Sequence, residues 1–363
     1  MKGVVISTDI CSTLTEAVNS VTFDRLFVLT DTTTHELCWP IVSSLECMKS
    51  AHVITIGATD THKTLDTLAQ VWTEIGNGRG TRHSLLVNIG GGMVTDLGGF
   101  AASTFKRGIK YINVPTTLLS MVDASVGGKT GINFNGLKNE IGVFNAPETV
   151  ILDTIFLRTL DNDNICSGYA EMLKHGLISN RQHLAQLLQF PLDAPADELS
   201  RHLVPLGTMV GTSVSVKERI VEEDPLEHGI RKALNLGHTV GHAFESFALS
   251  FEDQPDNSRG IHPVLHGYAV AWGMVCELYL SAIKTAFPSD IMHECVRFIK
   301  RNYGILPITC DDYPTLLELM THDKKNTAGT INFTLLGEVG DIRINQTASK
   351  EEICEALDFF REA

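Results

Sequence analysis

The sequence lacks the features of membrane-spanning, exported and repeat proteins. No apolar stretch approaches the roughly 20 residues that a helix needs to cross a bilayer. The first residues, 1–7, carry one positive charge but neither a long apolar stretch nor a cleavage site, so we interpret them as a strand and not as a signal peptide. There is no internal repeat and no low-complexity tract.

The chain also lacks closely paired cysteines and an excess of positive charge. Its eight cysteines include no CxxC pair, which fits reduced thiols in a cytoplasmic protein better than a disulfide framework. The formal net charge of −14 disfavours nucleic acid and anionic membranes as partners. It does not exclude an anionic substrate, because basic residues lie near the motifs described below. For any one of these residues, a solvated surface position is the simpler interpretation.

The length and the composition indicate a globular protein of two domains. With 363 residues, 43% hydrophobic and 20% charged, the chain is too long for one small core. Residues 1–160 alternate short apolar runs with helical patterns, which predicts a Rossmann-like α/β domain with a mostly parallel sheet. Residues 161–363 follow a polar break at 161–164 and predict a mainly α-helical domain.

Particular elements follow from the same patterns. The predicted strands are 4–7, 25–30, 52–57, 84–89, 111–114 and 149–152. The predicted helices are 35–45, 63–75, 94–103, 168–178, 206–221, 238–250, 266–284 and 290–301. A small hairpin is expected from 330–336 and 341–344, and a capping box at 349–352 predicts a final helix.

Three consecutive glycines end one of the predicted strands. Gly90–Gly92 follow an apolar run and precede a predicted helix, an arrangement that presents backbone N–H groups to a phosphate. The segment is not the GxGxxG fingerprint of dinucleotide-binding folds, and a tight turn without a ligand explains it equally well. Asp96, with Asp31, Asp60 and Lys63, could bind ribose or adenine, although a helix cap or surface charge is the simpler role for each.

A second unusual segment runs from Asp123 to Asn133. It packs three glycines, a carboxylate and Lys129 into a short span with little apolar mass, and Lys138 and Asn139 follow soon after. Such a segment buries poorly, so we expect a functional loop here, with a plain surface loop as the alternative.

One carboxylate and three imidazoles could together hold a metal ion. Glu171 and Lys174 share a helix face, as do His238 and His242, while His266 begins another helical pattern. The HExxH motif of zinc proteases would need glutamate where the chain has Thr239, so that motif does not assign both histidines to a metal. Three protein ligands and an open position suit catalytic zinc, although any single histidine is more often structural.

A buried cation is suggested in the predicted helix 206–221. Lys217 falls on an apolar stripe, where a lysine must either extend its amine to solvent or meet an anion. Extension to solvent is the commoner outcome, but Arg231 and Asn235, just before His238, favour an anion or polyol site.

Taken in order, these motifs resemble those of the 3-dehydroquinate synthase family of sugar-phosphate cyclases. They are GGGMVTD from Gly90, PTTLLSMVDASVGGKTGIN from Pro115, KNEIGVF from Lys138, GYAEMLK from Gly168, NLGHTVGHAFE from Asn235 and HG at His266. The resemblance covers nearly the whole chain. It implies an NAD-binding domain, a helical metal domain with the active site between them, and a homodimer. A fold-level relationship to iron-type alcohol dehydrogenases is also implied.

The resemblance also implies an activity. A 3-dehydroquinate synthase converts 3-deoxy-D-arabino-heptulosonate 7-phosphate to 3-dehydroquinate and phosphate, in the second step of the shikimate pathway. The cofactors would be NAD and Zn²⁺, with Co²⁺ as a possible substitute.

Residue roles are implied position by position. The metal would be bound by Glu171, His238 and His266. NAD would be contacted by Asp31, Asp60, Lys63, Gly91, Gly92, Val94, Asp96, Thr116, Thr117, Lys129, Lys138, Phe156 and Thr159. The substrate would be surrounded by Asp123, Lys129, Asn139, Lys174, Lys217, Arg231, Asn235, His242, Lys324 or Lys325, and Arg107, the last perhaps from a partner subunit. One departure is Ala58–Asp60, where the family often has Gly-Glu.

Three other functions are open. The closest is another sugar-phosphate cyclase, one that makes an inosose or valiolone ring. An NAD- and metal-dependent alcohol dehydrogenase would release NADH, and a binding protein without activity would not need the complete metal set.

Overall fold

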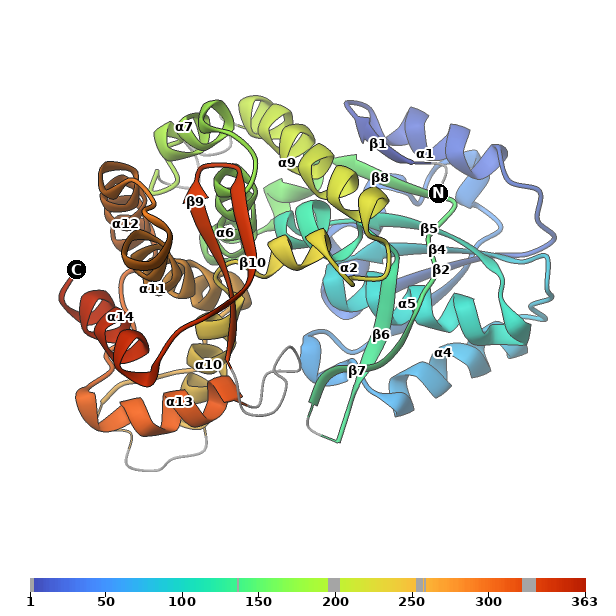
Figure 1. The fold of residues 1–363 in the computed structure, drawn as a ribbon. Helices are drawn as coiled ribbons and strands as arrows, with labels where there is room; N and C mark the ends of the chain where they lie inside the picture. Colours follow the sequence, from blue (N-terminus) through green and yellow to red (C-terminus); the bar gives the residue numbers. More distant parts are fainter. Residues whose placement is uncertain (1–2, 136, 195–202, 253–256, 258, 322–330) are drawn as a thin grey trace. The chain divides into compact units, whose positions relative to one another are not determined.

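The computed structural model describes residues 3–135, 137–194, 203–252, 257, 259–321 and 331–363 (Figure 1). The chain forms two compact units, and each is described here by itself. The first unit consists of residues 1–161 and 200–214, and the second of residues 162–199 and 215–363. The prediction of a parallel-sheet part followed by a mainly helical part is confirmed.

A six-stranded parallel sheet forms the centre of the first unit. Its strand order is β1-β8-β5-β4-β2-β3. The bounds are β1 (Val4–Ser7), β2 (Leu26–Asp31), β3 (His52–Ile56), β4 (Leu85–Gly90), β5 (Lys110–Pro115) and β8 (Thr149–Asp153). Every residue of β2 and β4 is buried, as expected of a parallel sheet covered on both faces. The strand order reverses between β2 and β4, where open α/β sheets bind ligands at the carboxyl ends of the strands.

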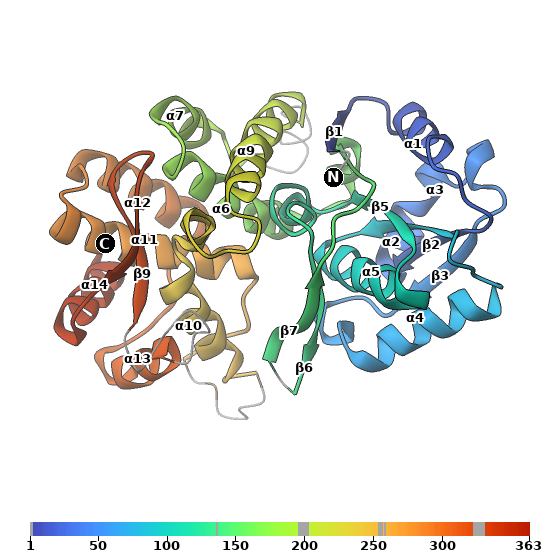
Figure 2. The ribbon, with the colours of Figure 1, turned by 45° about the vertical axis from the view of Figure 1, so that its right-hand side comes forward.

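Five helices accompany this sheet. They are α1 (Ile10–Asn19), α2 (Thr32–Leu37), α3 (Trp39–Val42), α4 (Leu65–Asn77) and α5 (Gly92–Thr104). Helices α4 and α5 pack beside each other and against the sheet (Figure 2). The single predicted helix 35–45 is wrong, because Pro40 sits in the first turn of a separate helix, α3. The predicted start of α4 at Lys63 is also wrong, since Thr64 caps a helix that begins at Leu65.

The expected loop after Asp123 is in large part an antiparallel hairpin. Strand β6 (Lys129–Phe134) pairs with β7 (Leu137–Phe144), preceded by a short π-helical turn (Ser120–Ala124). A Cβ at Gly131 would lie 2.5 Å from the carbonyl oxygen of Ile141, so this glycine permits close strand approach and does not signal a loop.

The second unit is built mainly from helices around α11 (His266–Thr285). The others are α6 (Asn162–Leu177), α7 (Arg181–Gln189), α9 (Leu203–Glu223), α10 (His238–Leu249), α12 (Ser289–Tyr303), α13 (Tyr313–Thr321) and α14 (Lys350–Glu362). Helix α9 contributes residues to both units. Helix α11 packs against α6, α10, α12, α14 and strand β9 (Asn332–Glu338), which explains why it is apolar on nearly every side.

Two local predictions concern this unit. One boundary between the two units falls between Asp161 and Asn162, within the predicted polar break, and α6 already begins at Asn162. The hairpin is confirmed, with β9 paired to β10 (Asp341–Thr347), and Ser349 and Glu352 form the predicted capping box. In the two units together, the described residues also form short helical turns, at Glu46–Met48, Asp60–His62, Phe105–Arg107, Thr154–Thr159, Ile230–Asn235 and Cys310–Asp312. Within the described residues, no helix has the length and apolar character needed to span a membrane.

Candidate metal centre and cofactor-binding turn

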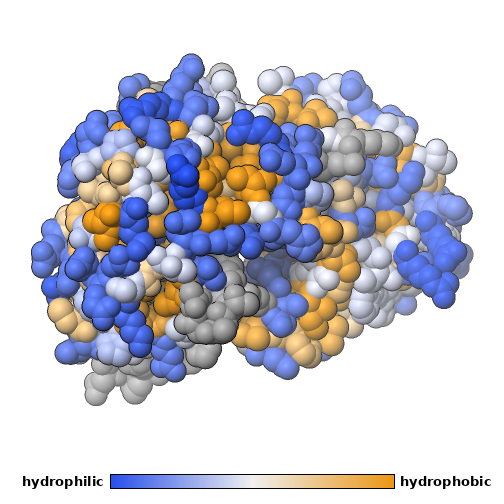
Figure 3. Space-filling view, viewed as in Figure 1, coloured by the Kyte–Doolittle hydropathy of each residue, from blue (hydrophilic) through white to orange (hydrophobic). Residues whose placement is uncertain are grey.

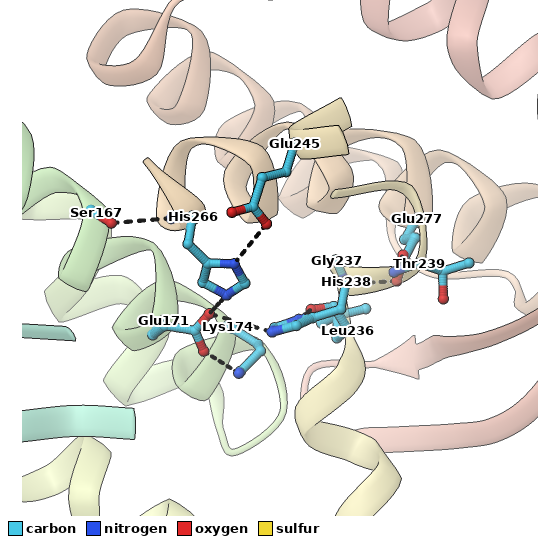
Figure 4. Close-up of polar contacts among 11 residues, drawn as sticks. Ser167, Glu171, Lys174, Leu236, Gly237, His238, Thr239, Glu245, His266 and Glu277 are labelled. Atoms are coloured by element: carbon cyan, nitrogen blue, oxygen red, sulfur yellow. Dashed lines mark hydrogen bonds and ion pairs between the residues drawn. The ribbon is translucent and has the colours of Figure 1, made fainter. Parts of the chain in front are cut away.

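Glu171, His238 and His266 meet in the second unit, although they come from three different helices. Glu171 is fully buried on α6, and its Oε1 atom accepts no hydrogen bond. That oxygen lies 3.6 Å from Nε2 of His238, at the start of α10, and 3.7 Å from Nε2 of His266, at the start of α11. Figure 4 shows both rings pointing these nitrogens toward the carboxylate. We call these three side chains the acid–imidazole cluster.

The other ring nitrogen of each histidine is held by an outer partner. Nδ1 of His238 donates to the carbonyl oxygen of Leu236 at 3.1 Å. Nδ1 of His266 donates to the carboxylate of Glu245 at 3.3 Å. Outer hydrogen bonds of this kind fix the tautomer and the orientation of metal-binding histidines. Both rings therefore present Nε2 as the ligand atom.

The spacing of the cluster suits a divalent cation. Tetrahedral Zn²⁺ holds nitrogen and oxygen ligands at about 2.0–2.1 Å, which places ligand atoms roughly 3.3 Å apart. The 3.6 and 3.7 Å separations around Glu171 are close to that value. His242 lies beside the cluster, and one ring nitrogen from each of His238, His242 and His266 falls within 4.8 Å of the others. The donor set thus fits the metal that the sequence predicts, with His242 as a further neighbour.

Buried charges surround Glu171. Burial opposes its charged form, but Lys174 and His266 hold the pKa of the Glu171 carboxyl well below its usual range. The amine of Lys174, itself buried, donates to the second carboxylate oxygen. Burial also opposes a charge on His266, yet the neighbouring carboxylates of Glu171 and Glu245 raise the pKa of its imidazole to about 10. A cation that binds here would take the place of that proton.

Several predicted substrate residues also lie in the second unit. Lys217 on α9 is buried, so it does not extend its amine freely into solvent. Arg231 is buried in the turn 230–235, where its guanidinium donates to the carbonyl oxygen of Pro225 at 2.6 Å. Asp224 accepts hydrogen bonds from the backbone N–H of Arg231 and of two preceding residues, which fixes this turn. Asn235, in the same turn, donates to Glu227 at 3.3 Å.

In the first unit, the three glycines lie at the carboxyl edge of the sheet. Gly90 ends β4, and Gly91 precedes α5 without a side chain that caps the helix. The first N–H groups of α5 are therefore available to an anion. Thr116, which follows the neighbouring strand β5, donates its backbone N–H to Gly90. Asp31 ends β2 on the other side and caps α2. Asp31, Gly91 and Thr116, three of the predicted cofactor residues, thus lie at the ends of neighbouring strands, beside the point where the strand order reverses.

A polar network lies in the same unit. Lys63, which is 4% exposed, donates to Asp96 at 2.6 Å and also to Asn139. Asn133 donates to Asp60 at 2.9 Å and accepts from the backbone N–H of Asn139. Lys63 thus joins Asp96 and Asn139, and Asn133 connects Asp60 to them. All of these except Asn133 were predicted to contact a cofactor or the substrate.

The remaining predicted residues differ in burial, and two of them lie outside the described residues. The side chains of Val94 and Phe156 are fully buried, so only their backbones could reach a cofactor. Thr159 donates to the carbonyl oxygen of Phe156. Exposed or partly exposed positions are occupied by Gly92, Arg107, Thr117, Asp123, Lys129 and Lys138. Lys324 and Lys325 lie outside the described residues.

Comparison with known proteins places the chain in a family. Residues 53–167 match the sequence model described as 3-dehydroquinate synthase N-terminal, and residues 168–326 match the one described as 3-dehydroquinate synthase C-terminal. The chain is 54% identical over 360 residues to a 3-dehydroquinate synthase of Parabacteroides distasonis, covering 99% of this chain and 98% of the relative. The chain belongs to the 3-dehydroquinate synthase family. The predicted resemblance is thereby confirmed.

Solved structures of other sugar-phosphate cyclases share the fold of this 3-dehydroquinate synthase family member. A 2-epi-5-epi-valiolone synthase from Streptomyces hygroscopicus subsp. jinggangensis, with NAD⁺ and Zn²⁺ bound, has a TM-score of 0.82 at 24% identity, covering 99% of this chain and 96% of that one. A 2-deoxy-scyllo-inosose synthase complexed with carbaglucose-6-phosphate, NAD⁺ and Co²⁺ has a TM-score of 0.77 at 22% identity, with the same coverage. At these identities the likeness establishes the fold alone.

Two carboxylates that support the acid–imidazole cluster escaped the sequence reasoning. Glu245 stands inside the NLGHTVGHAFE motif, but no role was assigned to it. Glu245 follows His242 by three positions on a predicted helix, so the two lie on the same face. This spacing indicates that Glu245 lies near the metal centre. Glu277 is fully buried on the apolar helix α11, and a lone acid in such a pattern must find hydrogen-bond donors. Glu277 thus carries the same sequence signal as Lys217, a charged residue within an apolar helical pattern.

One backbone feature lies at the departure from the family pattern. Thr59 has φ 76° and ψ 158°, a region that glycine occupies and that costs other residues free energy. Thr59 and Asp60 lie in the segment where the family resemblance implies Gly-Glu. The strained residue directly precedes the turn that leads to Lys63.

Proposed function

We propose that this protein is an active 3-dehydroquinate synthase, which forms 3-dehydroquinate and phosphate from 3-deoxy-D-arabino-heptulosonate 7-phosphate. The proposal rests on family membership and on one structural observation. Glu171, His238 and His266 converge with their ligand atoms 3.6 and 3.7 Å apart and their outer nitrogens already engaged. We assign the metal to these three residues and NAD to the glycine turn 90–92 with its neighbours.

The cofactors supply the redox part of the reaction. NAD held by the turn 90–92 would supply a reversible hydride acceptor for a secondary alcohol of the substrate, and a divalent cation held by Glu171, His238 and His266 would supply Lewis-acid activation of that alcohol. The intermediate ketone acidifies the neighbouring C–H bond, so that a proton and the phosphate can leave together. After reduction, ring opening and an intramolecular aldol step close the carbocycle. No NADH accumulates, because the hydride returns to the same substrate.

The protein's own residues orient the substrate and handle its charge. Lys217 and Arg231 are buried cations, and local hydrogen bonds fix the turn that carries Arg231. Buried cations are suited to bind a phosphate or a carboxylate more than a neutral sugar. Positioned cations of this kind hold the leaving phosphate where it can accept the neighbouring proton. His242, beside the cluster, is our candidate for proton transfer.

The assay that tests this function follows phosphate and NADH together. The protein is incubated with the heptulosonate phosphate, catalytic NAD and Zn²⁺. We expect phosphate and the cyclic product in equal amounts with no net NADH. An alcohol dehydrogenase would accumulate NADH without phosphate. Another sugar-phosphate cyclase would turn over a heptulose or hexose phosphate that lacks the carboxylate, and either outcome would overturn the assignment.

We further propose a cytoplasmic homodimer. All eight cysteines are free, which suits a reducing compartment. Strand β7 exposes Leu137, Ile141, Val143 and Phe144, and Figure 3 shows apolar side chains gathered over the region of this hairpin. An exposed apolar strand of this kind is typical of an interface.

The dimer can be tested by light scattering over a dilution series. A Phe144→Asp variant should dissociate at higher protein concentration than the wild type, because it places a charge on this strand. Leu249→Asp is the matched control, since Leu249 is similarly exposed but lies on α10. Equal behaviour of the two variants would remove β7 from the interface.

A further inference from the structure

Glu277 is a carboxylate buried in the middle of the apolar helix α11. Its side chain is 0% exposed. One oxygen accepts a hydrogen bond from the backbone N–H of Gly237 at 2.6 Å. The other accepts from the backbone N–H groups of Thr239 at 3.1 Å and Val240 at 3.3 Å. All three donors belong to the start of α10, as Figure 4 shows for the first two.

These contacts supply a cap that α10 cannot make for itself. The helix begins at His238, and the residue before it, Gly237, has a left-handed backbone with φ 80° and no side chain to accept from the first N–H groups. Unpaired N–H groups in a buried place are costly, and a negative charge is favourable at a helix N-terminus. Glu277 meets both needs from the neighbouring helix.

The cap also connects two members of the acid–imidazole cluster. Gly237 and Thr239 flank His238 directly, and Glu277 lies on the same helix as His266. Its hydrogen bonds therefore tie the backbone on both sides of one histidine to the helix that carries the other. A shift of α10 relative to α11 would change the distance between the two Nε2 atoms, and a metal site tolerates little such change.

We propose that Glu277 is a positioning residue for the metal centre. It contacts neither metal nor substrate, and it sets the position of His238 relative to His266 through the backbone of α10. This inference rests on the proposed metal-binding role of the acid–imidazole cluster. It predicts that loss of the carboxylate weakens metal binding in the absence of substrate and NAD.

A purely structural role would leave metal binding unchanged, and α11 offers a matched control. Ser281 lies one helical turn after Glu277 and is equally buried. Its hydroxyl donates to the backbone carbonyl oxygen of Glu277 at 2.7 Å, within α11, and accepts from the backbone N–H of Leu336 at 3.0 Å, which joins α11 to β9. A Ser281→Ala variant therefore removes two buried hydrogen bonds of α11, while the Glu277 carboxylate keeps its three N–H donors.

The experiment measures metal affinity in the full-length protein. Zn²⁺ binding is measured by competition with a chromophoric chelator, and Co²⁺ absorption spectra report the coordination geometry. The Glu277→Gln variant keeps the side-chain volume but places an amide group against the N–H donors. We expect its affinity for Zn²⁺ to fall by about 10- to 100-fold, as is usual when an outer partner of a metal ligand is lost, with an altered Co²⁺ spectrum. The Glu277→Asp variant should lie between it and the wild type.

The remaining variants separate the possible failures. Ser281→Ala should bind Zn²⁺ as the wild type does, even where its thermal midpoint falls. If Glu277→Gln lowers the thermal midpoint but retains wild-type affinity and spectrum, the positioning role is overturned. If His238→Ala binds Zn²⁺ as tightly as the wild type, the proposed metal site itself fails. Should Glu277→Gln not fold, Glu277→Asp carries the same comparison with Ser281→Ala.

Discussion

The acid–imidazole cluster and the glycine turn differ in what positions them. The cluster stands on three helices. Glu245 contacts His266, Lys174 contacts Glu171, and Glu277 accepts from the backbone that flanks His238. The glycine turn stands at the edge of a parallel sheet, where backbone hydrogen bonds and the absence of Cβ atoms set its shape. The first region is therefore sensitive to the removal of side-chain atoms, and the second to their addition.

The largest effect is expected from removal of a ligand in the cluster. His238→Ala should lower the affinity for Zn²⁺ by more than about 100-fold, the upper end for loss of an outer partner, because an inner ligand contributes more. His242→Ala should slow turnover while the metal content survives. Metal analysis of the purified variants beside kcat measures the difference. Equal zinc loss in both variants would make His242 a ligand and would end this division of roles.

The contrast between the two regions also explains which features could be predicted from the sequence. Local motifs predicted the strand ends and the glycine turn, because each carries its own chemistry at short spacing. The three members of the cluster lie far apart in the sequence, and the family resemblance was needed to choose them. Glu277 acts across two helices, and only the packing of α10 on α11 reveals its donors. The hairpin from Lys129 was predicted as a loop for a related reason. Its glycines allow β6 to approach β7 closely, and the sequence alone does not show that the two strands pair.

A smaller effect should follow from adding one methyl group near the glycine turn. A Cβ at Gly98 would lie 2.1 Å from the side-chain oxygen of Asn88 and 2.8 Å from Leu29, both in buried strands. Gly98→Ala should therefore lower the free energy of unfolding by about 1–3 kcal/mol, measured by urea denaturation. Gly91→Ala is the control, because its Cβ would meet only Thr117, at 3.1 Å. That variant should lose NAD affinity more than stability, and the reverse order would contradict a phosphate-binding role for the turn.

The smallest effect, and the only stabilising one, is expected at Thr59. Its φ of 76° and ψ of 158° lie in a region that is almost restricted to glycine, at a cost of about 1–3 kcal/mol for other residues. Thr59→Gly should relieve this strain and so raise the free energy of unfolding. Part of this increase is offset, because glycine has greater conformational freedom in the unfolded chain. We expect a net gain of about 1 kcal/mol in the free energy of unfolding, with NAD affinity retained because Lys63 and Asp96 keep their contact. Thr61→Gly, in the turn that follows and without a positive φ, should instead destabilise the protein. If both variants destabilise the protein equally, then Thr59 is not strained, and the departure from the family's Gly-Glu pattern carries no energetic cost.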